Sequence, residues 1–257
     1  GVRLVGSEMC IRDRCGTPAG GMLAGVILPP LIVLYDWRTA LYIIPAFVIG
    51  ALLISQVFGV GPREPQRTGS GVALRDVVSS LSFVWTDRLQ RGHALAGMVF
   101  AGSQLALATY LIVYLWRELS MAPELAGLIY ATHHVSGIAA RILLGFVAGR
   151  WIATRTILPL LAYIMAAGLI AIAVSDESWP VWVFYGAAVV LGIGGNGWVG
   201  LFMSEIALLA PDGRAADATS GNQFFMYGGI VAGPAISSLL LGIADSYLVL
   251  FVTFAGA

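Results

Sequence analysis

Long stretches without charged residues constrain this chain more than any other feature. They lie at 16–35, 39–62, 92–116, 124–150, 156–175, 178–204 and 218–244, and only Arg141 interrupts one of them internally. A helix needs about 20 apolar residues to cross the hydrocarbon core of a bilayer. Each stretch is therefore long enough to span a membrane, whereas a final stretch at 246–257 is too short.

These stretches predict helices and not strands. They lack the alternation of apolar and polar residues that the strands of a membrane barrel show, and lipid leaves helices as the other way to satisfy the backbone. The composition agrees, since 58% of the residues are hydrophobic and 11% are charged, against about 25% charged in a soluble domain. We expect an all-α, polytopic membrane bundle with seven full spans and a truncated eighth.

The charged residues and cysteines exclude several functions. The 14 basic residues are all arginine and balance 14 acidic residues, which leaves no positive field for nucleic acid. Without lysine, the sequence can form neither a Schiff base with a cofactor nor a Walker-A phosphate loop. Two cysteines are too few for a disulfide framework or a metal cage. Since catalytic motifs are also absent, we expect no enzyme, no cofactor and no metal.

Residues 1–15 differ from the rest of the chain. The string GVRLVGSEMCIRDR at 1–14 is rich in charge and has no helical or strand periodicity. It lacks the apolar core of a signal peptide, and SEMCIRDR resembles translated read-through of a sequencing adapter. We interpret 1–15 as a non-native or disordered segment and the chain as a fragment.

The distribution of arginine predicts the orientation. The connections after 39–62, 124–150 and 178–204 share one side of the membrane and carry eight arginines, against two on the other side. The positive-inside rule makes the arginine-rich side cytoplasmic. Because arginine is the only basic residue and alanine and glycine are abundant, we expect a multi-pass protein of a bacterial inner membrane.

The connection at 59–91 is long and polar. Its second part carries Val77, Val78, Leu81, Val84 and Trp85 at helical spacing, which predicts an amphipathic helix at the cytoplasmic surface. A linker of this kind indicates a boundary between two bundles. We expect 16–58 to form the last two helices of an N-terminal bundle, and 92–257 to form a C-terminal bundle truncated in its last helix.

This arrangement resembles the major facilitator superfamily, in which two six-helix halves are joined by a long cytoplasmic loop. Aligning 59–91 with that loop makes the predicted spans the fifth to twelfth of the family. Three local strings agree with the family's patterns, and Gly149 replaces the usual aspartate in the second. They are Tyr35-Asp36-Trp37-Arg38, Gly137-x3-Arg141-x3-Gly145-x3-Gly149-Arg150 and Gly228-Gly229-x3-Gly233-Pro234.

The resemblance implies a secondary transporter that moves a small organic solute by alternating access. Protons are the expected coupling ion, the lipid bilayer is the expected environment, and the four N-terminal helices of the family are missing. A single arginine within a span favours an organic anion as the solute. The alternative is a seven-helix receptor or sensor without transport, which the long loop after the second span does not favour.

The stretch at 124–150 holds the candidates for coupling or gating. Arg141 must face protein or water, because a charge inside a bilayer is costly; it either packs among glycines or forms part of an anion site or gate. His133 and His134 either relay protons or act as hydrogen-bonded packing residues, since histidine titrates near physiological pH. The candidates are His133, His134, Arg141 and Arg150.

Polar and small residues in the other spans give two further sets. Buried amides need partners, so they either join helices or line a solute path; glycines allow helices to approach closely. The pathway candidates are Gln104, Tyr110, Asn196, Asn222, Gln223 and Tyr227. The packing candidates are Gly137, Gly145, Gly149, Gly229, Gly233 and Pro234.

Overall fold

The computed structural model describes residues 16–57 and 74–257, and these residues form helices and turns without a strand. The all-α class predicted from the sequence is confirmed. Residues 1–15 and the first part of the predicted linker lie outside the described residues. The helices are α2 (Gly16–Leu34), α3 (Trp37–Leu41), α4 (Ile43–Val57), α5 (Leu74–Thr86), α6 (Arg88–Arg117), α7 (Pro123–Val147), α8 (Thr154–Ala173), α9 (Val181–Leu209), α10 (Ala215–Ala244) and α11 (Tyr247–Gly256).

Six segments in the described ranges are long and apolar enough to cross a membrane, one fewer than the sequence predicted. They are α2, the segment Trp37–Val57 that contains α3 and α4, α6, α8, α9 and α10. The difference is α7, whose apolar character is reduced by His133, His134 and Arg141. Its 25 residues still extend about 37 Å, which exceeds the ~30 Å of a hydrocarbon core. The apolar helix α11 has 10 residues and is shorter than these six segments.

Several helix boundaries differ from the ends of the predicted stretches, and two of these differences have a local cause. Helix α6 begins at Arg88 instead of residue 92, because the Asp87 carboxylate caps it by accepting a hydrogen bond from the backbone N–H of Gln90 at 2.9 Å. Helix α7 ends at Val147 instead of residue 150. Gly149 follows in a turn with φ of +74°, where an added Cβ would meet no atom within 4 Å. The left-handed backbone, and not helix packing, therefore accounts for this glycine.

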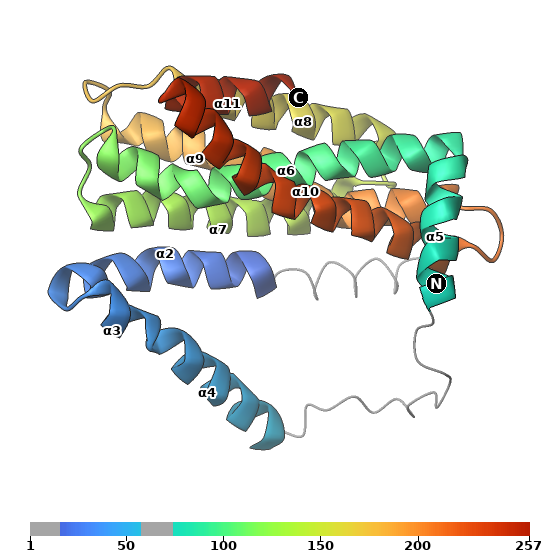
Figure 1. The fold of residues 1–257 in the computed structure, drawn as a ribbon, viewed down its shortest axis with the longest axis horizontal. Coiled ribbons are helices and arrows are strands. Elements are labelled where there is room, and N and C mark those ends of the chain that lie inside the picture. The colour runs from blue at the N-terminus through green and yellow to red at the C-terminus, as the bar shows by residue number, and fades with distance from the viewer. Residues whose placement is uncertain (1–15, 58–73) are drawn as a thin grey trace.

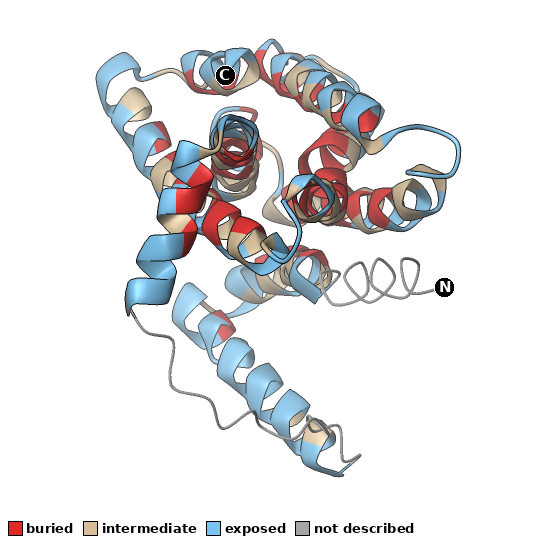
Figure 2. Ribbon diagram, turned by 90° about the vertical axis from the view of Figure 1, so that its right-hand side faces the viewer, coloured by how far each residue is buried: buried red, intermediate tan, exposed pale blue. Residues whose placement is uncertain are grey.

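Helices α6 to α11 lie together in one bundle (Figure 1), and its buried apolar residues form two clusters that both include residues of α6, α8 and α9. Helix α9 packs against α7 on one side and α8 on the other, while α10 lies along α6. Trp198, Phe184 and Ile206 of α9 are among the largest fully buried side chains. Figure 2 shows that buried residues gather where these helices face one another.

Helices α2 and α4 relate to this bundle in different ways. Helix α2 lies beside α7, and an added Cβ at Gly25 would be 2.8 Å from the carbonyl oxygen of Gly127. Helix α4 diverges from the bundle and has no buried residue (Figures 1 and 2). Asp36, between α2 and α3, caps the N-terminus of α3. Its pKa is lowered because its carboxylate accepts hydrogen bonds from Thr39.

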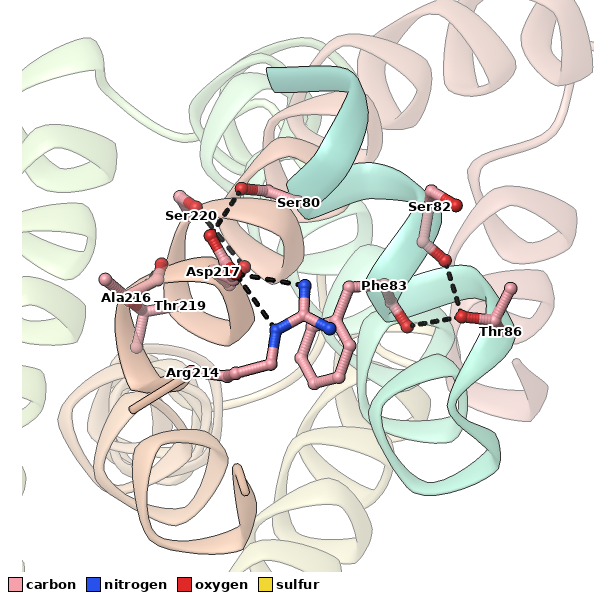
Figure 3. Close-up of polar contacts among 9 residues, drawn as sticks. All are labelled: Ser80, Ser82, Phe83, Thr86, Arg214, Ala216, Asp217, Thr219 and Ser220. Carbon is pink, nitrogen blue, oxygen red and sulfur yellow. Dashed lines mark hydrogen bonds and ion pairs between the residues drawn. The ribbon is translucent and has the colours of Figure 1, made fainter. Parts of the chain in front are cut away.

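Helix α5 occupies the predicted amphipathic segment and is attached to the start of α10 (Figure 3). The Ser80 hydroxyl donates to Asp217 at 3.2 Å, and Asp217 pairs with Arg214 at 3.0 Å. The Arg214 guanidinium lies 3.9 Å from the centroid of the Phe83 ring. Val84 is fully buried beside Phe83, whereas Trp85 is half exposed. One edge of α5 thus packs onto the bundle. The predicted contact of this helix with the cytoplasmic surface stays a prediction.

Candidate functional site

A continuous chain of polar side chains is buried between α6, α7 and α9. Trp198 of α9 donates its indole N–H to Gln104 Oε1 of α6 at 3.2 Å, and Gln104 Nε2 donates to Asn196 Oδ1 of α9 at 2.8 Å. Asn196 Nδ2 lies 2.9 Å from Nε2 of His133 on α7. We call these four residues the polar chain. Three are fully or almost fully buried, and Gln104 is partly exposed.

The hydrogen bonds of the polar chain all run in one direction, from Trp198 toward His133. An indole N–H can only donate, so Gln104 presents its oxygen to Trp198 and its nitrogen to Asn196. Asn196 then presents its own nitrogen to His133. His133 Nε2 must accept this bond, which places the proton of the neutral ring on Nδ1.

Arg141 binds the backbone of Asn196, the central residue of the polar chain. Its Nε donates to the carbonyl oxygen of Asn196 at 2.6 Å, and the side chain is buried. The approach is possible because Gly137 lies between them on α7, where an added Cβ would sit 2.5 Å from Asn196 Cβ. Helix α7 therefore holds Asn196 by its backbone through Arg141 and by its side chain through His133.

His134 faces a different neighbour from His133. An added Cβ at Gly21 of α2 would lie 2.5 Å from His134 Nε2, and the Tyr130 ring centroid is 4.6 Å from that of His134. Neither ring nitrogen of His134 has a hydrogen-bond partner among the described residues. The two adjacent histidines are thus divided: His133 points into the polar chain, and His134 points toward α2.

The pathway candidates on α10 lie apart from the polar chain. Asn222 is buried and donates to Gln90 Oε1 of α6 at 2.9 Å. Tyr110 is a pathway candidate on α6, and its hydroxyl donates to the carbonyl oxygen of Pro234 on α10 at 3.4 Å. Gln223 is partly exposed and Tyr227 is 57% exposed.

The remaining candidates are placed as follows. Added Cβ atoms at Gly229 and Gly233 would overlap the α6 backbone at Met98 and Gly102, respectively, so α6 and α10 touch through their backbones. Gly145 lies in α7 and is partly exposed. Arg150 is exposed in the turn after α7, 5.8 Å from the centroid of the Trp151 ring.

Two residues that take part in the buried hydrogen bonds were not predicted from the sequence, Trp198 and Gln90. Trp198 is not among the candidates predicted from the sequence, and its role as a donor depends on Gln104, which is remote in sequence. Gln90 was assigned to the linker, although it is buried in the first turn of α6. The spacing Asp87-x-x-Gln90 is a helix-start signal that predicts this turn. In the described part of the chain, no group of three or more His, Cys, Asp or Glu side chains could hold a metal ion.

Comparison with known proteins identifies the family. The family model described as Major Facilitator Superfamily matches residues 14–255. This chain belongs to the major facilitator superfamily. The prediction drawn from the loop position and the helix count is confirmed. A comparison with curated proteins found no match.

One solved structure shows how this superfamily member resembles its relatives. The crystal structure of a variant of the E. coli fucose:proton symporter FucP is similar to the chain with a TM-score of 0.60 and 19% identity. The match covers 88% of this chain and 55% of FucP, so the chain spans about half the length of that protein. At this identity the similarity shows a shared fold.

Proposed function

We propose that this chain is part of a secondary active transporter that moves a small organic solute across a membrane by alternating access. The polar chain is the observation that carries the proposal. It places titratable and amide side chains between three helices of the bundle. Family membership supports the same reading, because members of this superfamily are membrane transporters.

Protons are the proposed coupling ion. His133 bonds to Asn196 of α9, and His134 faces α2. A movement of α7 against α9 would change the contacts of His133, and a movement of α7 against α2 would change those of His134. The name of FucP states that it is a proton symporter, and the shared fold makes that coupling a reasonable expectation here.

The solute class and the membrane are part of the same proposal. An arginine buried against Asn196 favours a solute that carries a negative charge, so we propose an organic anion. The arginine-only, Ala- and Gly-rich composition favours a bacterial inner membrane. In this arrangement the described helices correspond to the fifth to twelfth of the family, and the first four come from outside this sequence.

The test measures proton movement in proteoliposomes that contain the full-length protein. An internal pH-sensitive dye reports proton entry when fucose or small carboxylates such as lactate and benzoate are added outside. We expect acidification with at least one carboxylate and its loss in Arg141→Gln, whereas Arg117→Gln, an exposed arginine at the end of α6, keeps the signal. A solute that binds but does not cross the membrane would contradict the proposal and favour a receptor.

A further inference from the structure

The hydrogen bonds of the polar chain end at one acceptor atom, Nε2 of His133, which can bind a proton. In the arrangement described above, every bond points from Trp198 toward His133, and Nε2 of His133 is the final acceptor. The chain is therefore directional, and both ends are fixed by chemistry. Trp198 can only donate, while neutral His133 accepts through Nε2.

Protonation of His133 changes its Nε2 from a hydrogen-bond acceptor into a donor. The imidazolium carries hydrogens on both nitrogens, so Nε2 becomes a donor and no longer accepts from Asn196. Two N–H groups would then face each other across the 2.9 Å contact. Rotation of the Asn196 amide by half a turn exchanges its oxygen and nitrogen, which restores a hydrogen bond from His133 to Asn196 Oδ1.

The amide of Gln104 must then rotate by half a turn as well. With Asn196 turned, its nitrogen faces Gln104 Nε2 across the 2.8 Å contact, so Gln104 must turn as well and offer its oxygen to Asn196. Gln104 Nε2 then faces the indole N–H of Trp198, which cannot accept. Trp198 keeps a partner, since its N–H also lies 3.1 Å from the carbonyl oxygen of Gly195.

We propose that Nε2 of His133 is a proton-binding site whose occupancy reverses the hydrogen-bond direction of the polar chain and releases Trp198 from Gln104. This inference rests on the proposed proton coupling and adds the atom that binds the proton and the residues that report it. Gln104 is the partly exposed member of the polar chain, and the reversal exchanges the positions of its amide oxygen and nitrogen.

His133 is fully buried, and Nδ1 of its ring has no hydrogen-bond partner among the described residues. On its own helix, the His134 ring centroid lies 4.9 Å away and that of Tyr130 6.3 Å away, and Arg141 follows two turns later. The atoms that approach from α9 belong to Gly192, Gly195 and Asn196, and α6 contributes Gln104 to the chain. None of these is titratable, and α2 carries no titratable residue between Gly16 and Leu34. The carbonyl oxygen of Gly195 is the acceptor that remains for Trp198.

Nuclear magnetic resonance of the indole N–H groups tests the proposal. The full-length protein is labelled with 15N-tryptophan in lipid nanodiscs, and Trp198→Phe identifies the Trp198 peak. As the pH is lowered, we expect this peak to move upfield in the proton dimension, because the bond to Gln104 is lost. His133→Gln removes the pH response, while His134→Gln keeps it. The loss of the response in His134→Gln but not in His133→Gln would overturn the proposal.

A second variant covers the case in which His133→Gln fails to fold. Gln104→Met keeps the length of the side chain but ends the polar chain after Asn196, so the Trp198 peak should become insensitive to pH while His133 is intact. A pH response that persists in Gln104→Met overturns the reversal. Proteoliposome assays separate the two hypotheses: a pH-sensitive Trp198 without proton-coupled transport contradicts the proposed function and leaves the proton site supported.

Discussion

The segment Trp37–Val57 and helix α9 are both apolar enough to span a membrane, yet they are buried to very different degrees. In the most apolar window of each, 6% of the residues of Trp37–Val57 are buried inside the structure, against 72% for α9. The segment that contains α4 is the more apolar of the two. Apolar character therefore predicts that a helix lies in lipid, but it does not predict whether other helices pack against it.

Small residues allow the close packing of α9. An added Cβ at Gly194 would lie 2.5 Å from the backbone nitrogen of Met165 in α8, and one at Gly197 would lie 3.3 Å from Ala140 in α7. In α4, an added Cβ at Gly50 would meet no atom within 4 Å. Lipid tails are as apolar as leucine, so close backbone approach, and not hydrophobicity, drives helix association in a bilayer.

The largest expected effect is that of a methyl group added to α9. Gly194→Ala places the methyl against the Met165 backbone, which cannot move aside, and should destabilise the protein by about 1–3 kcal/mol. The measurement is thermal unfolding of the detergent-solubilised protein. Gly50→Ala in α4 is the matched control and should be neutral or stabilising by up to ~1 kcal/mol. Equal stability of the two variants would contradict the contrast between the helices.

The next effect concerns the centre of the polar chain. Asn196→Leu removes the partner of both Gln104 and His133 and should cost about 1–2 kcal/mol as well as abolish proton-coupled uptake. Gln56→Leu changes an exposed amide of α4 and should leave unfolding unchanged. Unfolding temperatures and uptake rates of both variants give the comparison. Normal uptake by Asn196→Leu would show that the polar chain is only structural.

Helix α2 provides an intermediate case. Gly25→Leu inserts a side chain between α2 and the Gly127 backbone and should separate α2 from α7, so we expect uptake to fall several-fold while the core around α9 unfolds at nearly the normal temperature. Gly20→Leu is the control, because an added Cβ there meets no atom within 4 Å. If both variants transport equally, the contact between α2 and α7 does not contribute to the transport cycle.

The smallest effect is expected where α5 joins α10. The Arg214 and Asp217 side chains are 41% and 39% exposed, so solvent screens their attraction. Asp217→Asn should change the free energy of unfolding by less than about 1 kcal/mol, and less at high salt. Chemical denaturation at two salt concentrations measures this. A larger change would mean that the hydrogen bond from Ser80 to Asp217 holds α5 in place.

Individual residues show how far sequence reasoning extends into the site. The sequence predicts Gln104 and Asn196 because buried amides need partners. It predicts His133 because histidine titrates near physiological pH, and Arg141 because a charge inside a bilayer is costly. The sequence treated them as separate candidates, and it gave His133 and His134 the same role. In the structure the first three are bonded to one another, and the two histidines face different helices. Trp198 was not among the candidates, although a buried indole N–H needs an acceptor, because the sequence does not show that Trp198 is buried beside Gln104.

The sequence by itself determined that this chain is an all-helical membrane protein, where its helices lie and to which superfamily it belongs. These properties depend on the length and apolar character of continuous stretches, which can be read along the chain. Only the tertiary structure decided which polar residues meet, which glycines form contacts and which apolar helix is left without neighbours. The physical reason is that partners such as Gln104 and Asn196 are 92 residues apart in sequence, and periodicity within one helix carries no information about the helix that packs against it.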